Sequence, residues 1–122
     1  LSYSLYYLTD TDPRPQGWGA AERGVGNLGN YLRAIDYKTG KIVWKHSTLN
    51  GAQGLLSTAG GLLFGSDGAG NFIAFDPMNG KPLWHAGLSA NPSNAPQTYM
   101  LDGRQYVVVG AGDSLYAFML QR

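Results

Sequence analysis

The 122-residue sequence has no cysteine, few charged residues and no long apolar run. The absence of cysteine excludes a disulfide framework, a thiolate metal site and a cysteine nucleophile. Charged residues are 14% of the chain and its formal net charge is +1, which gives no positive field able to capture nucleic-acid phosphates. Residues 1–8 alternate like a strand and lack both the length of a membrane-spanning helix and the basic flank of a signal peptide. We therefore expect no nucleic-acid partner and no membrane span in this segment.

Glycine and short apolar runs dominate what is present. The chain has 18 glycines, 43% hydrophobic residues and 12% aromatic residues. Short runs of Val, Leu, Ile, Tyr and Phe alternate with Gly, Asn, Asp and Pro, and no run follows the 3.6-residue period of an amphipathic helix. This pattern predicts an all-β fold. The predicted strands are residues 1–8, 31–36, 41–46, 53–58, 62–66, 71–76, 81–86, 97–101, 105–110 and 115–119, with a long loop over residues 9–30.

A repeat with a period of 40 residues organises the sequence. Residues 34–44 return as residues 74–84, and residues 115–118 begin a third copy that the chain does not complete. Four predicted strands in each period are typical of β-propeller blades, which bury their apolar faces by stacking on neighbouring blades. We therefore expect a partial β-propeller of four-stranded antiparallel blades. The positions shared by the two full copies are Ala34, Asp36, Gly40, Lys41 and Trp44 in the first, and Ala74, Asp76, Gly80, Lys81 and Trp84 in the second.

The acidic and glycine positions of the repeat predict two equivalent turns. Asp36 and Asp76 each end a predicted strand, where a carboxylate accepts bonds from backbone N–H groups and shapes a turn. Gly40 and Gly80 occupy the position at which a hairpin loop of this length needs a positive φ. The two segments are therefore expected to form the same hairpin.

The tryptophans of the repeat predict contacts between blades. Trp44 and Trp84 lie four residues after each glycine, on the returning strand, where a large ring fills the space between adjacent blades. The small side chains of Ala34 and Ala74 leave room for such rings. If each indole N–H reaches a carbonyl of the neighbouring blade, each tryptophan both packs against that blade and fixes its spacing. We interpret these residues, with the turn residues, as structural docking positions.

The repeat unit resembles the tryptophan-docking motif of quinoprotein propellers. Residues 56–64, 74–85 and 96–109 look like the C-terminal end of a pyrroloquinoline quinone (PQQ)-dependent dehydrogenase. The resemblance implies an eight-bladed propeller in the periplasm, in which PQQ on the axis, Ca²⁺ as Lewis acid and an aspartate base oxidise an alcohol or a sugar. It also implies that residues 1–30 are a strand and long loop of a preceding blade, and that residues 31–122 form the C-terminal blades.

One stretch of the chain corresponds to a cofactor contact in the family. Relatives typically carry Trp-Gly-Gly or Asn-Gly-Gly before the segment equivalent to residues 56–61, whereas this chain has Ala52, Gln53 and Gly54. The resemblance therefore names Gln53 and Gly54 as cofactor-binding candidates, because a Gln amide offers hydrogen bonds to a quinone carboxylate. The family's calcium ligands and catalytic aspartate have no counterpart in this segment, so we expect PQQ and Ca²⁺ in the full-length parent and neither in this fragment alone.

The sequence also permits other interpretations. A propeller of PQQ-like repeats without cofactor would be a periplasmic binding or assembly scaffold, and the departure of residues 52–53 from the residues typical of relatives favours this interpretation. A β-sandwich accommodates ten short strands but does not explain the repeat. His46 and His85 are interpreted as packing residues, because no third metal ligand lies nearby in the sequence. The partners expected are the remaining blades of the parent, with self-association of the fragment through its open strand edges.

Overall fold

Nine antiparallel strands in three sheets make up the described part of the computed structural model, which comprises residues 29–50 and 54–120. Within these ranges there is no helix, so the prediction of an all-β fold is confirmed. The strands are β1 (Asn30–Ile35), β2 (Ile42–Thr48), β3 (Leu56–Ser57), β4 (Leu63–Ser66), β5 (Asn71–Phe75), β6 (Pro82–Gly87), β7 (Gln97–Leu101), β8 (Arg104–Ala111) and β9 (Ser114–Met119).

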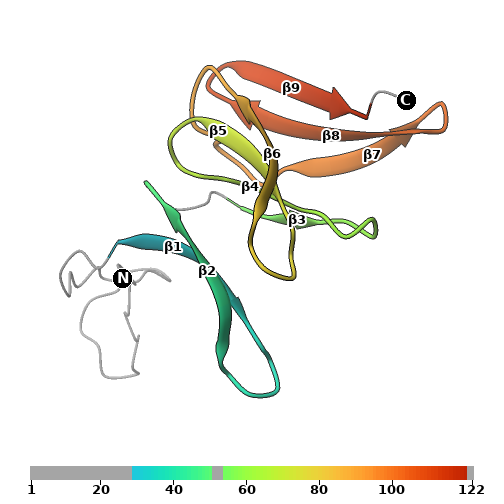
Figure 1. The fold of residues 1–122 in the computed structure, drawn as a ribbon. Coiled ribbons are helices and arrows are strands. Elements are labelled where there is room, and N and C mark those ends of the chain that lie inside the picture. Colours follow the sequence, from blue (N-terminus) through green and yellow to red (C-terminus); the bar gives the residue numbers. More distant parts are fainter. Residues whose placement is uncertain (1–28, 51–53, 121–122) are drawn as a thin grey trace, which may run out of the picture.

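The strands pair in sequence order within each sheet. β1 and β2 form a hairpin, β3 to β6 form a four-stranded sheet, and β7 to β9 form a three-stranded sheet. The three sheets succeed one another across the molecule, from β1 and β2 through β4 and β5 to β8 and β9 (Figure 1). Three consecutive sheets of this kind exclude the two-sheet sandwich.

Strand β5 lies at the centre of the packing because both of its faces are covered. Ile73 and Phe75 point toward the first sheet, where they cluster with Leu32 of β1. Phe72, on the other face, clusters with Val109 of β8 in the third sheet. This double burial explains why β5 reads as a continuous apolar run rather than an alternating one. The sheets therefore bury their faces against one another, as the repeat predicts.

The nine strands match the predicted positions from residue 31 onward, with one clear difference. Of the strand expected over residues 53–58, the structure describes residues 54–58, and only the two residues of β3 are strand. Its first part departs from strand geometry at Gly54, where φ is +133°. The strand predicted over residues 1–8 and the loop predicted over most of residues 9–30 lie outside the described residues.

The antiparallel order places alternate connections at opposite ends of the sheets. One end, the turn end, carries the connections at residues 36–41, 58–62, 76–81 and 102–103. The other, the loop end, carries those at residues 67–70, 88–96 and 112–113 and the residues that follow β2. The docking candidates gather at the turn end, and the cofactor candidate Gly54 lies at the loop end.

Candidate functional site

The first Asp-Gly turn, at residues 36–40, is organised by the carboxylate of Asp36. Its Oδ1 accepts bonds from the backbone N–H groups of Lys38 at 2.9 Å and Thr39 at 2.8 Å, and from the Thr39 hydroxyl at 3.1 Å. Hydrogen bonds from the backbone and side chain of Thr39, and then from the backbone of Lys38, lower the pKa of Asp36. The Gly40 N–H donates to the Asp36 carbonyl at 2.8 Å, and Gly40 has a φ of +68°.

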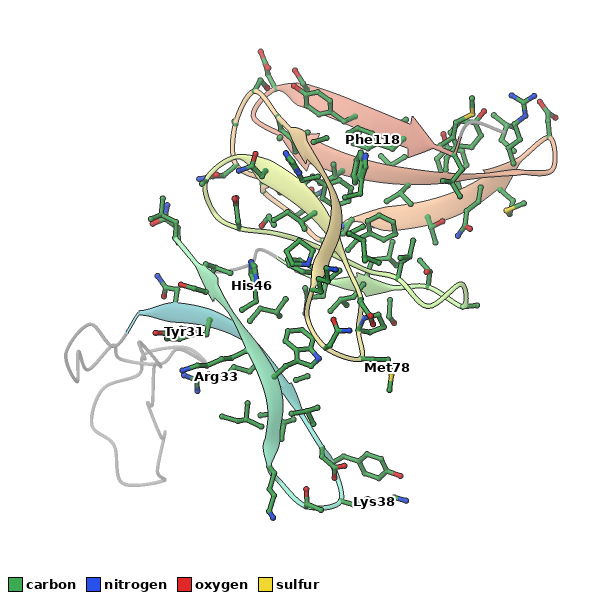
Figure 2. The ribbon with its side chains drawn as sticks, viewed as in Figure 1. Tyr31, Arg33, Lys38, His46, Met78 and Phe118 are labelled. Atoms are coloured by element: carbon green, nitrogen blue, oxygen red, sulfur yellow. The ribbon has the colours of Figure 1, made fainter. Side chains whose placement is uncertain are left out.

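The second turn, at residues 76–80, repeats this geometry forty residues later. Asp76 Oδ1 accepts from the Met78 N–H at 2.8 Å, and Oδ2 accepts from the Asn79 amide at 2.7 Å. The Gly80 N–H donates to the Asp76 carbonyl at 2.8 Å, and Gly80 has a φ of +71°. Figure 2 shows both turns, marked by Lys38 and Met78, at the same end of the molecule. The residues that recur in the sequence therefore form the same kind of turn in both hairpins.

Trp44 joins the first sheet to the second turn. Its indole Nε1–H donates to the carbonyl of Pro77 at 2.8 Å. Its ring lies over Gly80, so closely that a Cβ added to that glycine would overlap ring atoms of Trp44. Ala34 stands directly opposite Trp44 in the β1–β2 pair, where its small side chain leaves the ring unobstructed. One hydrogen bond and one close ring contact thus connect two consecutive hairpins.

Trp84 has a different environment from Trp44. It lies opposite Ala74 in the β5–β6 pair, as Trp44 lies opposite Ala34. Its ring meets the edge of Phe118 at 5.2 Å between centroids and that of Phe72 at 6.3 Å, and the side chain remains 42% exposed. No hydrogen bond from its indole N–H is found within residues 29–50 and 54–120. Trp84 packs against the third sheet without the carbonyl contact that Trp44 makes.

The two histidines lie on different sheets. His46 of β2 packs the edge of its ring against Phe75, with 4.9 Å between centroids and 66° between planes (Figure 2). His85 lies on β6 opposite Ile73 and is exposed. In the part of the chain that the structure describes, no group of three His, Cys, Asp or Glu side chains is arranged to hold a metal ion.

At the loop end, Gly54 is packed tightly against the connection between β6 and β7. A Cβ added to Gly54 would lie 2.6 Å from Cβ and 2.7 Å from Cα of Ala95. The space that a side chain would need is therefore filled by protein, which together with the positive φ explains why this position is a glycine. Ala52 and Gln53 lie outside the described residues.

The loop end also holds contacts that sequence reasoning missed. The Leu49 N–H donates to the carbonyl of Asp67 at 2.7 Å, and the Asn50 amide donates to the carbonyl of Gly68 at 2.9 Å. These bonds connect the residues after β2 with the β4–β5 loop of the next sheet. The only sequence signal was the cluster of Asp, Gly and Asn at residues 67–71, which indicates a turn but not its partner. The Pro77 carbonyl was likewise not identifiable, because any backbone carbonyl has the same chemistry.

No helix within the described ranges has the length and apolarity needed to span a membrane.

Comparison with known proteins identifies the family. Residues 47–107 match the model of the PQQ β-propeller domain of glucose, ethanol and alcohol dehydrogenases. The quinoprotein alcohol dehydrogenase PedE of Pseudomonas putida is 43% identical over 126 residues, covering 88% of this chain and 20% of that protein. The quinoprotein glucose dehydrogenase A of Acinetobacter calcoaceticus is 34% identical, covering 67% of this chain and 13% of that protein.

A solved structure supports the same assignment. The quinohemoprotein alcohol dehydrogenase from Comamonas testosteroni superposes with a TM-score of 0.64 at 35% sequence identity, over 67% of this chain and 12% of that chain. The chain thus spans a fifth or less of the length of each of these relatives. The shared sequence and the shared arrangement of antiparallel sheets lead to one conclusion: the chain belongs to the PQQ β-propeller family of glucose, ethanol and alcohol dehydrogenases.

Proposed function

We propose that this chain is the C-terminal part of the propeller of a PQQ- and calcium-dependent dehydrogenase that oxidises an alcohol or a sugar. Residues 31–122 provide the last blades, and residues 1–30 belong to a preceding blade. The names of the relatives support this substrate class, since they include ethanol, alcohol and glucose dehydrogenases. The parent protein acts in the periplasm, as the family resemblance implies.

The role of the chain within that enzyme is structural, and the contact of Trp44 with the next turn carries this proposal. A hydrogen bond to the Pro77 carbonyl and a ring pressed on Gly80 fix one hairpin against the next. Such a contact sets the spacing of blades around the propeller axis. The docking positions proposed are Ala34, Asp36, Gly40 and Trp44, and their equivalents Ala74, Asp76, Gly80 and Trp84.

The parent's chemistry is supplied by PQQ, which accepts electrons from the substrate, with Ca²⁺ as Lewis acid. This chain contributes no catalytic residue and no metal ligand to it. Its proposed contribution is the pair Gln53 and Gly54, which would help to hold PQQ: the Gln53 amide would offer it hydrogen bonds, and Gly54 has no side chain to stand in the way. The isolated chain is inactive and binds neither PQQ nor Ca²⁺.

The full-length parent provides the test of this function. The purified apo-protein is reconstituted with PQQ and Ca²⁺, and dye-linked oxidation of ethanol, longer primary alcohols and glucose is measured alongside the quinone absorbance. Bound quinone with turnover of an alcohol or a sugar supports the proposal. Neither absorbance nor turnover would favour the alternative of a cofactor-free assembly scaffold.

The isolated chain is also proposed to self-associate. Its outer strands β1 and β9 each pair on one side only within the described sheets, and an unpaired strand edge offers N–H and C=O groups to another chain. Sedimentation velocity over a range of concentrations measures this directly. A single monomeric species at all concentrations would contradict it.

A further inference from the structure

The second turn contains a reactive pair of residues that its structural role does not require. Asn79 is followed by Gly80, whereas the chain's other Asn-Gly pair, at residues 50–51, lies partly outside the described residues. In such a pair the backbone nitrogen of the glycine can attack Cγ of the asparagine and displace its amide, because glycine has no side chain to shield that nitrogen. This reaction is one reason why asparagine is a thermolabile residue. The first turn has Thr39 and Gly40 at the equivalent positions and therefore has no amide to lose.

In the folded chain, three hydrogen bonds hold the reacting groups of Asn79 and Gly80. The attacking nitrogen of Gly80 donates its N–H to the carbonyl of Asp76 at 2.8 Å. The amide nitrogen of Asn79, which is the leaving group, donates to Asp76 Oδ2 at 2.7 Å. The amide oxygen of Asn79 accepts from the Lys81 N–H at 2.8 Å. Because the Asn79 side chain cannot turn toward the Gly80 nitrogen without breaking these bonds, the reaction requires the turn to open.

Trp44 of the preceding sheet holds this turn closed. Its ring covers Gly80, which is buried, while the neighbouring Asn79 is exposed to water. Its indole N–H donates to the carbonyl of Pro77 at 2.8 Å, so the ring and the hydrogen bond fix two residues of the same turn, which Met78 marks in Figure 2. A group that reacts only after a local opening reacts at a rate proportional to the population of the open form. That population depends on the contact with Trp44.

We propose that Asn79 is a site of spontaneous deamidation and that the contact of Trp44 with the second turn controls its rate. A bond forms between the Gly80 nitrogen and Asn79 Cγ, the Cγ–Nδ2 bond breaks, and ammonia leaves with the proton of the Gly80 N–H. Water then opens the five-membered imide to give aspartate or isoaspartate. Either product places a carboxylate where the Asn79 amide now donates to Asp76, so two like charges face each other and weaken the turn. Isoaspartate also adds one atom to the backbone next to Gly80, beneath the Trp44 ring.

The test measures the rate at which residue 79 of the full-length parent loses its amide, by peptide mapping with mass spectrometry during incubation at mildly alkaline pH. The folded protein is compared with the same protein unfolded in guanidinium chloride, and the unfolded protein is expected to react at least about tenfold faster. Trp44→Ala should raise the rate in the folded protein about tenfold. Trp84→Ala, the matched control, should raise it less than about twofold, because the Trp84 ring packs on Phe72 and Phe118 rather than on the second turn.

A gentler pair of variants keeps the proposal testable if Trp44→Ala does not fold. Trp44→Phe retains a ring but loses the bond to Pro77, and is expected to raise the rate about fivefold, whereas Trp84→Phe leaves it unchanged. Asn79→Thr, which copies Thr39 of the first turn, should abolish the modification at this position and unfold at a higher temperature than Asn79→Asp, which copies one product. Equal rates in the folded and unfolded parent, or in Trp44→Phe and Trp84→Phe, would overturn the proposal, and so would an amide that survives in the unfolded protein.

Discussion

The two hairpins of the repeat have the same turn but different surroundings. In both, an aspartate closes the turn, a glycine adopts a φ near +70°, and an alanine faces the tryptophan across the strand pair. Yet Gly80 is buried beneath Trp44, whereas Gly40 is exposed and a Cβ there would meet nothing within 4 Å. The shared Asp, Gly, Ala and Trp positions thus produce the same kind of turn, while the energetic role of each residue depends on which hairpin lies next to it.

The largest expected difference between the hairpins concerns their tryptophans. Trp44→Ala removes the ring above Gly80 and the bond to Pro77, and should lower the free energy of unfolding by about 4 kcal/mol. Trp84→Ala should cost less than about half of that, because the Trp84 side chain is 42% exposed and donates no hydrogen bond within the described residues. Urea denaturation of the two variants of this chain measures both values. Equal losses would show that the observed contact does not distinguish the two hairpins.

The second-largest expected difference is the loss of stability when each turn glycine is replaced by alanine. Gly40→Ala introduces only the strain of a positive φ, about 1 kcal/mol. Gly80→Ala introduces the same strain and also forces the new Cβ against the Trp44 ring, for a total of about 3 kcal/mol. Combining Gly80→Ala with Trp44→Ala removes the clash, so the double variant should lose less stability than the sum of the two single losses. Strict additivity in this double-mutant cycle would contradict the close contact.

A smaller effect isolates the indole hydrogen bond from the packing of the ring. Trp44→Phe retains an aromatic ring but leaves the Pro77 carbonyl without its donor, and should cost about 1 kcal/mol more than Trp84→Phe. The midpoint of thermal unfolding, recorded for both variants under one condition, gives the difference. If Trp84→Phe proved the more destabilising of the two, the assignment of the interblade bond to Trp44 would be wrong.

The smallest effect comes from the acidic residues that shape the turns. Hydrogen bonds from Thr39 and Lys38 lower the pKa of Asp36 from its ordinary value of 3.8. A carboxyl with a lowered folded-state pKa contributes stability that is present above the unfolded pKa and is lost as the pH falls through the folded value. We therefore expect the turn to be unaffected by pH between 5 and 7 and to weaken below about pH 4.

NMR titration of the Asp36 carboxyl carbon checks this expectation. Asp36→Asn serves as the control, because its turn should show no such change with acid. Asp67 offers a second titration at the opposite end of the sheets: partial burial raises its pKa, but the hydrogen bonds from Asn71 and Ala69 outweigh this, so that the net pKa is lowered. An Asp36 carboxyl that titrated at or above 3.8 would contradict the hydrogen bonds described for the first turn.

Much of the fold could be predicted from the sequence because its signals are local. Gly40, Gly80 and the Asp102–Gly103 turn mark hairpins whose geometry depends on a few adjacent residues. The alternating runs between them gave the strand positions. The strand expected over residues 53–58 was wrong at Gly54, because that residue adopts a φ of +133° and packs against Ala95, some forty residues further along the chain. No local pattern contains that contact.

The candidate site was predictable only in part. The repeat indicated that Trp44 and Trp84 fill space beside their neighbours, but it could not identify the carbonyl of Pro77 as the acceptor. It also gave no reason to treat the two tryptophans differently. Asn50 and Gly68 illustrate the same limit at the loop end. Neither residue carries a sequence signal for the other, and their contact exists only because two sheets pack side by side. Family resemblance named Gly54 as a cofactor candidate, whereas its packing against Ala95 became visible only in the structure.

The sequence by itself determined the turns, the strand order within each hairpin and the repeating unit, because these depend on φ preferences, side-chain alternation and hydrogen bonds between residues close in the chain. The tertiary structure alone decided which tryptophan makes the interblade bond, which glycine is covered and which loop holds Asn50. These contacts join residues on different sheets, and they form only when apolar faces such as those of β5 are buried on both sides.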